Sequence, residues 1–142
     1  MSAVKVSALI GPALGWAVAK ALDLPVVMLH DLMWKVAAEN NYKGDLAWHF
    51  EARKNEPWIA TGHGIEGSPL PEYGADWSYG GPIIERESIS LTPCDDMESW
   101  AADATFRQGV ETQYGPTPLI AAMRCYVASR LGDEVDIPEE LL

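Results

Sequence analysis

The chain has 142 residues, 48% of them hydrophobic, so it is long enough to fold around one core without metal or disulfide support. Its formal charge of −11 argues against a general nucleic-acid binder, which needs cations to displace counterions from phosphates. Two cysteines do not make a disulfide scaffold, and no apolar run predicts a signal peptide or a membrane span. We therefore expect one cytoplasmic domain, residues 1–142.

The N-terminal segment predicts an extended stretch and then a buried helix. Val4 and Val6 fit the beginning of a short strand or an extended lead-in. Pro12 suits the first position of a helix, and apolar residues recur at helical spacing from there to Leu22. Pro25 prevents the helix from continuing. Its single internal charge indicates a helix that packs inside the protein.

The next segment is partly ambiguous. Residues 26–29 predict a short strand. Residues 32–39 fit either a helix capped by Asp31 or an alternating strand, and their helix-forming composition favours the helix slightly. Residues 46–53 alternate apolar and polar side chains, which predicts a half-buried strand.

The segment 55–79 is rich in glycine and proline and is the least regular part of the chain. A loop of this length is often functional. It also carries four aromatic residues that regular packing would not all bury: Trp58, Tyr73, Trp77 and Tyr79. Because apolar patches on a surface usually mark interfaces, we predict a homodimer with at least one of these aromatics in its interface.

The following segment predicts a hairpin. Gly80-Gly81-Pro82 is expected to be a tight backbone feature, after which a strand opens at Ile83 and continues to Leu91. Residues 100–106 predict the returning strand, so 88–106 is the candidate hairpin. Near the C-terminus, Val135 and Ile137 alternate with acids, which permits a short edge strand.

Residues 115–131 predict the central helix of the fold. Thr117 is a good N-cap, Pro118 suits the first helical position, and Gly132 is a typical helix terminator. One face is large and apolar and the opposite face is small and apolar, interrupted only by Arg124 and Arg130. A helix that is apolar all round is normally buried on two sides. The predicted fold class is therefore α+β: a single domain in which two mostly buried helices pack with a small antiparallel β-sheet.

Three blocks carry a resemblance to a known family: residues 4–22, 76–91 and 115–138. Their most specific parts are Asp76-Trp77 with Gly80-Gly81-Pro82-Ile83-Ile84-Glu85-Arg86, and the run from Gly115 to Arg124. In this order they resemble the NinX-like family of small phage and prophage proteins. Between residues 24 and 73 the chain departs from the pattern and is longer than typical members. The resemblance implies an origin in temperate phages and a bacterial host cell, and it implies no activity.

Motifs for catalysis or cofactors are weak. The spacing Gly62-x-Gly64-x-x-Gly67 matches a dinucleotide fingerprint, but Ser-Pro-Leu-Pro follows where a helix should begin. His30, His49 and His63 are not spaced as metal ligands, and no Gly-x-Ser-x-Gly elbow is present. We therefore expect no catalytic residue, no metal and no cofactor. Glu85 and Glu87 would share one face of the predicted strand, where paired carboxylates are most often solvated.

The best candidate site is a polar and aromatic group around the glycine pair. Its members are Asp76, Trp77, Gly80, Gly81, Glu85, Arg86 and Arg124. A structural explanation competes with the functional one, because ion pairs within a fold use the same residue types. Six tryptophans in the chain favour the functional interpretation, a recognition surface, since tryptophan is enriched in interface hot spots.

Three functions remain open. The first is a phage accessory protein that binds a host or phage protein without catalysis. The second is a small enzyme whose site is built around residues 55–79. The third is an acidic mimic of nucleic acid that inhibits a DNA-binding protein.

Overall fold

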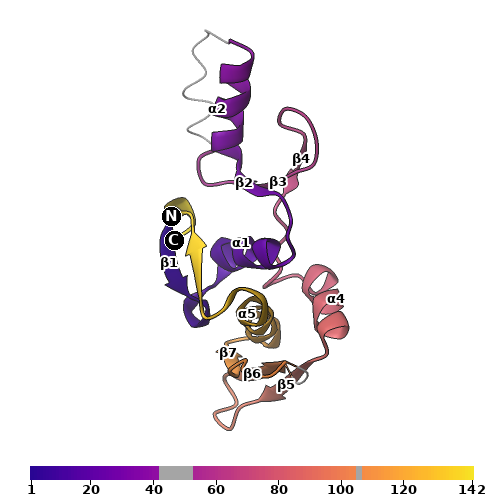
Figure 1. Cartoon of the computed structure of the whole chain (residues 1–142). Coiled ribbons are helices and arrows are strands. Elements are labelled where there is room, and N and C mark those ends of the chain that lie inside the picture. Colours follow the sequence, from indigo (N-terminus) through magenta and orange to yellow (C-terminus); the bar gives the residue numbers. More distant parts are fainter. Residues whose placement is uncertain (42–52, 105–106) are drawn as a thin grey trace.

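The computed structural model describes residues 1–41, 53–104 and 107–142 (Figure 1). Its helices are α1 (Gly11–Ala21), α2 (Leu29–Glu39), α4 (Trp77–Glu87) and α5 (Pro118–Leu131), with 3₁₀ turns at Val6–Ala8 and Glu139–Leu141. Its strands are β1 (Ser2–Lys5), β2 (Val26–Met28), β3 (Pro57–Ala60), β4 (Gly67–Pro69), β5 (Ile89–Pro93), β6 (Trp100–Ala104), β7 (Gln113–Gly115) and β8 (Glu134–Ile137). The α+β class predicted from the sequence is confirmed.

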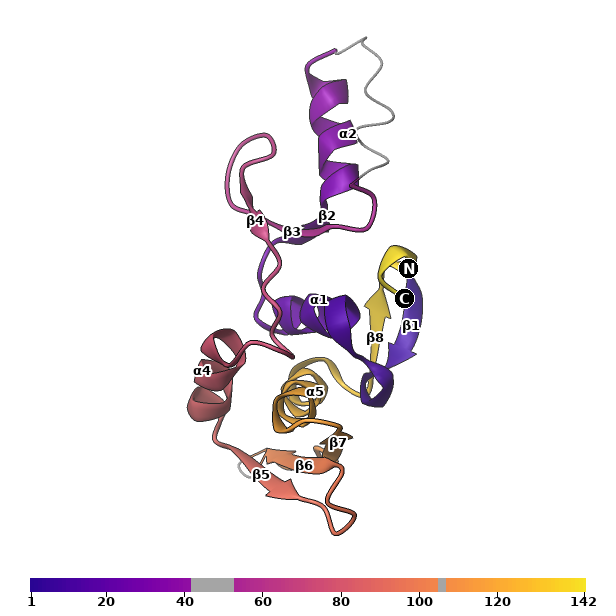
Figure 2. The ribbon, with the colours of Figure 1, turned by 180° about the vertical axis from the view of Figure 1, so that it is seen from behind.

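The strands form three small antiparallel sheets rather than one. Their orders are β1–β8, β2–β3–β4 and β5–β6–β7. Figures 1 and 2 show α1 and α5 lying between these sheets, which keeps the sheets apart. None of the sheets is large enough to hold a core by itself, so each depends on the helix that it packs against.

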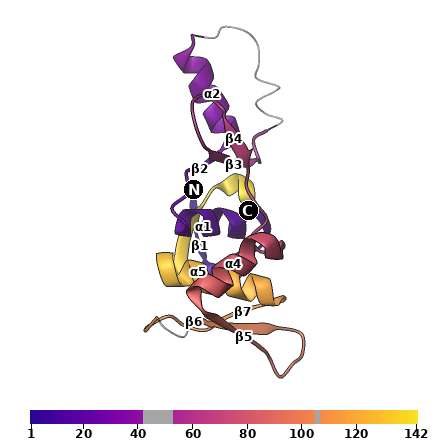
Figure 3. The same ribbon diagram turned by 90° about the vertical axis from the view of Figure 1, so that its right-hand side faces the viewer.

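Helix α5 is the centre of the core, as predicted. Sheet β5–β6–β7 packs on one side of it and helix α1 on the opposite side, and α4 covers a third side, in front of α5 in Figure 3. The Thr117 hydroxyl accepts a hydrogen bond of 3.1 Å from the Ile120 N–H, and Gly132 ends the helix at φ 89°. Both the large and the small faces of α5 are buried, at Leu119, Ala121, Ala122, Met123, Cys125, Tyr126 and Val127.

Helix α1 is the second buried helix, with residues 13–19 all inside the core. It lies against the two-stranded sheet, in which Val4 of β1 is paired with Val135 of β8. The predicted strands near both ends of the chain are therefore confirmed, and they are partners.

Helix α2 confirms the helical alternative for residues 32–39. It starts at Leu29, after Met28, so Asp31 lies in the first turn and is not the cap that we expected. Only Leu29 of α2 is buried, and the helix projects with β2–β3–β4 from the rest of the protein (Figures 1 and 2). Strand 26–29 is confirmed as β2, whereas the strand predicted at 46–53 lies, except for Arg53, outside the described residues.

Residues 77–87 form helix α4, so the strand predicted from Ile83 and the tight feature at Gly80-Gly81-Pro82 are both wrong. Pro82 lies inside the helix, where it cannot donate to the carbonyl of Ser78. Proline normally also excludes its preceding residue from the helical region through a clash with the Cβ atom. Because Gly81 has no Cβ atom, this clash does not occur before Pro82.

Strands β5 and β6 confirm the hairpin predicted at 88–106 as far as the structure describes it. Ile89 is paired with Ala104, and Pro93 with Trp100. The start of the hairpin is shifted, because Ser88 is the left-handed C-cap of α4 at φ 53°. The strand therefore begins only at Ile89.

The segment 55–79 is more regular than its composition suggested, since it contains β3, β4 and the start of α4. Its aromatics have different environments. Tyr73 is buried and Trp58 is half-buried, whereas Trp77 and Tyr79 are 53% and 49% exposed. Only the last two remain as surface aromatics.

The packing of α4 on α5 can be tested at Gly80. A methyl group at Gly80 would lie 2.5 Å from Leu119 Cδ1 and 2.7 Å from the Tyr73 carbonyl oxygen. We expect Gly80→Ala to lower the free energy of unfolding by about 1–3 kcal/mol through overpacking. Glu85→Ala is the control, because Glu85 is exposed on the same helix, and it should change that free energy by no more than about 0.5 kcal/mol. Urea unfolding of both variants measures the difference, and equal effects would contradict this packing.

Candidate functional site

Helix α4 carries six of the seven candidate site residues. Asp76 is its N-cap, and Asp76 Oδ1 accepts hydrogen bonds from the Ser78 N–H at 2.9 Å and the Ser78 hydroxyl at 2.6 Å. These hydrogen bonds from Ser78 hold the pKa of the Asp76 carboxyl below its ordinary value. Gly80 faces Leu119 of α5, which fixes the inner side of the helix. Asp76 and Gly80 thus position α4.

The outer side of α4 presents two flanks. Trp77, Gly81 and Glu85 follow one another at intervals of four residues, so they share one flank. Tyr79 and Arg86 are seven residues apart and share the other. The Tyr79 ring meets the buried Tyr73 ring edge to face, with centroids 6.1 Å apart. This contact holds Tyr79 in place while half of it remains exposed.

Arg124, the seventh candidate, lies on α5 and has a different environment. Its Nε–H donates to the Leu9 carbonyl at 2.9 Å, and Nη1 donates to the Tyr114 carbonyl at 2.7 Å. Burial lowers the pKa of its guanidinium below the ordinary value. Arg124 therefore ties the chain before α1 and strand β7 to the central helix.

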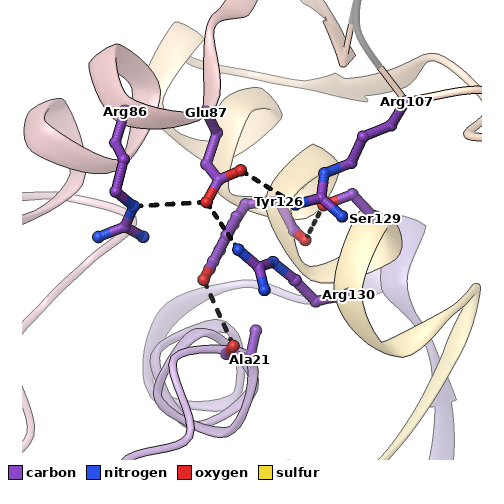
Figure 4. A network of polar contacts seen from close by, with 7 residues as sticks. All are labelled: Ala21, Arg86, Glu87, Arg107, Tyr126, Ser129 and Arg130. Carbon is purple, nitrogen blue, oxygen red and sulfur yellow. Dashed lines mark hydrogen bonds and ion pairs between the residues drawn. The ribbon is translucent and has the colours of Figure 1, made fainter.

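The densest polar cluster of the described residues surrounds Glu87, the last residue of α4 (Figure 4). Glu87 Oε1 accepts from Arg130 Nη2 at 2.9 Å and from Arg86 Nε at 3.4 Å, and Oε2 accepts from Arg107 Nη2 at 3.3 Å. The Glu87 side chain is 12% exposed, whereas the three arginine side chains are 40–55% exposed. We call Glu87 with these three arginines the arginine cluster.

The ring of Tyr126 supports the arginine cluster from below. The guanidinium carbon of Arg130 lies 5.6 Å from the centroid of the ring, and that of Arg86 lies 6.0 Å from it. The Tyr126 hydroxyl donates to the Ala21 carbonyl at 3.3 Å, which anchors the ring on α1 (Figure 4). Cation–π attraction at these distances favours the observed guanidinium positions.

Burial by itself would raise the pKa of the Glu87 carboxyl. The hydrogen bonds and charge of Arg130, with the hydrogen bonds of Arg86 and Arg107, outweigh that effect and lower the pKa below its ordinary value. Glu87 is therefore ionised at neutral pH. Three guanidiniums and one carboxylate leave a local charge of +2 on a chain whose total is −11.

This cluster was not predicted from the sequence, because Glu85 and Glu87 were expected to share one face of a strand. On a helix, residues two apart point about 200° away from each other. Glu85 is exposed, and Glu87 turns inward toward α5. Arg107 and Arg130 come from the segment after β6 and from α5, so no local motif indicates their meeting with Glu87.

The other motifs occupy ordinary positions. Gly67 of the dinucleotide-like spacing begins strand β4 and lies against Ile59 and Trp58 of β3. Within residues 1–41, 53–104 and 107–142, no group of three or more His, Cys, Asp or Glu side chains is placed to hold a metal ion. A groove of about 670 Å³ borders the 55–79 segment, and its lining is mainly apolar.

A family model described as "Bacteriophage P22, NinX" matches residues 5–130. The chain belongs to the NinX family. The matched range contains α4 and all four members of the arginine cluster, and it ends at Arg130. No curated protein sequence matches this NinX-family chain. Of the helices that the structure describes, none has the length and apolar character required to cross a membrane.

The arginine cluster predicts a specific dependence of stability on pH. The pKa of Glu87 is lower in the folded protein than in the unfolded chain, so its stabilising effect is present above the unfolded value of about 4.3. This effect disappears as the pH falls through the folded value. The loss of unfolding free energy caused by Glu87→Gln should accordingly be largest near neutral pH and shrink in acid. Chemical unfolding of the variant and the wild type from pH 7 to pH 3 measures this.

Glu85→Gln is the matched control for the pH experiment. Glu85 lies on the same helix but is exposed. Its replacement should change stability little at any of these pH values, as is usual for solvated surface charges. A constant difference between Glu87→Gln and wild type across the pH range would refute the role assigned to the Glu87 charge.

Proposed function

We propose that this phage accessory protein is a non-catalytic module that binds a host or phage protein in the bacterial cytoplasm through the outer side of α4. The family match supports the phage origin. The observation that carries the proposal is the pair of half-exposed aromatics, Trp77 and Tyr79, on a helix whose inner side is fixed to the core.

Helix α4 is held in place before any partner binds. The Asp76 cap, the close contact of Gly80 with Leu119 and the burial of Ile83 hold α4 in one position. An aromatic side chain on such a support loses little conformational freedom when a partner covers it. Buried aromatic anchors supply much of the binding energy of protein interfaces. The outer side of α4 therefore suits recognition of a protein surface with apolar pockets.

The partner can be identified by affinity purification from infected cells followed by mass spectrometry. We expect one stoichiometric protein partner, which the variant with both Trp77→Ala and Tyr79→Ala fails to retain. Tyr114→Ala is the control, because Tyr114 is 56% exposed but lies on β7. It should retain the partner, because only contacts made by α4 residues contribute to binding.

Other outcomes of this purification favour the alternative functions. Equal retention by the double variant would exclude the α4 surface. Capture of a nuclease or another DNA-binding protein through acidic residues would instead support the nucleic-acid mimic. A co-purifying small molecule bound in the groove beside residues 55–79 would support an enzyme.

We also propose that, in the absence of that partner, the protein forms a homodimer with Trp77 or Tyr79 in its interface. Twofold dimers are the commonest closed assemblies, and these are the half-exposed aromatics that remain from the 55–79 segment. The charge of −11 opposes association, so added salt should tighten the dimer by screening that repulsion. Sedimentation at low and moderate salt, with Trp77→Ala beside wild type, tests this. A monomer under all of these conditions would rule the dimer out.

A further inference from the structure

The arginine cluster concentrates positive charge in an acidic protein. The chain has 21 acidic and 10 basic residues, and three of its five arginines contact the single carboxylate of Glu87. One arginine could neutralise that carboxylate. The other two add positive charges that no carboxylate of the cluster neutralises. The cluster is therefore short of negative charge.

The cluster also has more hydrogen-bond donors than acceptors. A guanidinium carries five N–H groups. Arg86, Arg107 and Arg130 each direct one guanidinium nitrogen to Glu87, and these guanidinium groups form no other hydrogen bonds with the described residues. Both oxygens of Glu87 are already engaged. With 40–55% of each arginine side chain exposed, the remaining donors are accessible from solvent.

The three guanidiniums are held together before any ligand arrives. Arg86 and Arg130 share one oxygen of Glu87 and lie over the same Tyr126 ring. Arg107 approaches the other oxygen from the segment that follows β6 (Figure 4). Three separate parts of the chain thus converge on one point. Preorganisation of this kind lowers the entropic cost of binding.

We propose that Arg86, Arg107 and Arg130 form a binding site for a small oxyanion of the phosphate type. Guanidinium groups match the spacing of phosphate oxygens and form charge-assisted hydrogen bonds with them. A phosphate group would supply acceptors for the N–H groups that Glu87 does not engage. It would also supply negative charge to balance the two positive charges that remain. This site is separate from the protein-binding surface proposed for α4 and does not depend on it.

The charge of the whole chain restricts the size of the ligand. Screening limits electrostatic interactions to about 8 Å at physiological ionic strength. A compact anion in the cluster experiences mainly the local charge of +2. A long nucleic acid would extend beyond it over a surface whose overall charge is strongly negative. The ligand is therefore inorganic phosphate or the phosphate of a small ester.

Isothermal titration of the full chain with inorganic phosphate tests the site, with chloride adjusted to keep the ionic strength constant. We expect saturable binding that Arg107→Gln weakens by roughly fivefold or more, because one of the three charges is removed. The Arg107 side chain makes one hydrogen bond with the described residues, at 3.3 Å, so this variant should remain folded. Arg53→Gln is the control, because Arg53 is paired with Glu56 at 3.0 Å elsewhere on the surface, and it should bind phosphate as wild type does.

Glu87→Gln separates binding from a purely structural role. Glutamine keeps a side-chain oxygen that can accept from Arg86 and Arg130, and both arginines also lie over the Tyr126 ring, so the cluster stays assembled. The local charge rises from +2 to +3, so phosphate should bind more tightly than to wild type even though the variant is less stable. Absence of saturable phosphate binding, weaker binding by folded Glu87→Gln, or equal losses in Arg107→Gln and Arg53→Gln would overturn the proposal. A parallel titration with a nucleoside monophosphate distinguishes the sources: tighter binding than phosphate indicates an ester ligand, and weaker binding indicates the free anion.

Discussion

The two-sided burial of α5 is the constraint on which the rest of the structure depends. A helix that is apolar all round leaves much of its surface in water unless layers cover both faces. Sheet β5–β6–β7 covers one face, α1 covers the opposite face, and α4 covers a side between them (Figures 1 and 2). All of these elements contact α5. The Thr117 cap and the Gly132 terminator set the length of this helix and so the length of the core.

The close approach of α4 to α5 converts that packing into a polar site. Gly80 allows the two helices to touch at Leu119, near the start of each. Seven residues later, α4 ends at Glu87, which meets Arg130 in the last turn of α5. A side chain at position 80 would separate the helices and move Glu87 away from the arginines. The ion pairs of Glu87 therefore depend on the absence of a side chain at Gly80.

Local sequence signals predicted the helices and strands whose conformation depends mainly on nearby residues. They failed where contacts with distant residues determine the conformation. Caps and periodicity identified α5 and α1, two apolar runs joined by a polar turn identified the hairpin of β5 and β6, and alternation identified β8. The helix at 77–87 was missed because Gly80, Gly81 and Pro82 disfavour helices in isolation, and only packing against α5 compensates for them. The candidate residues on α4 were recognised as a group. Arg107 and Arg130 were not added to it, because they are 20 and 43 residues from Glu87 and no local pattern connects them.

Arg124 and Arg130 show why residue type alone does not define a site. Both interrupt the apolar surface of α5, and they lie only six residues apart. Arg124 donates to the backbone carbonyls of Leu9 and Tyr114, and so joins two other parts of the chain to α5. Arg130 shares one carboxylate with two other arginines, so the fold leaves both charge and donors unmatched at that end of the helix. A partner or ligand can recognise these unmatched positive charges and N–H groups. Their position depends on where α4 ends, because Glu87 is its last residue.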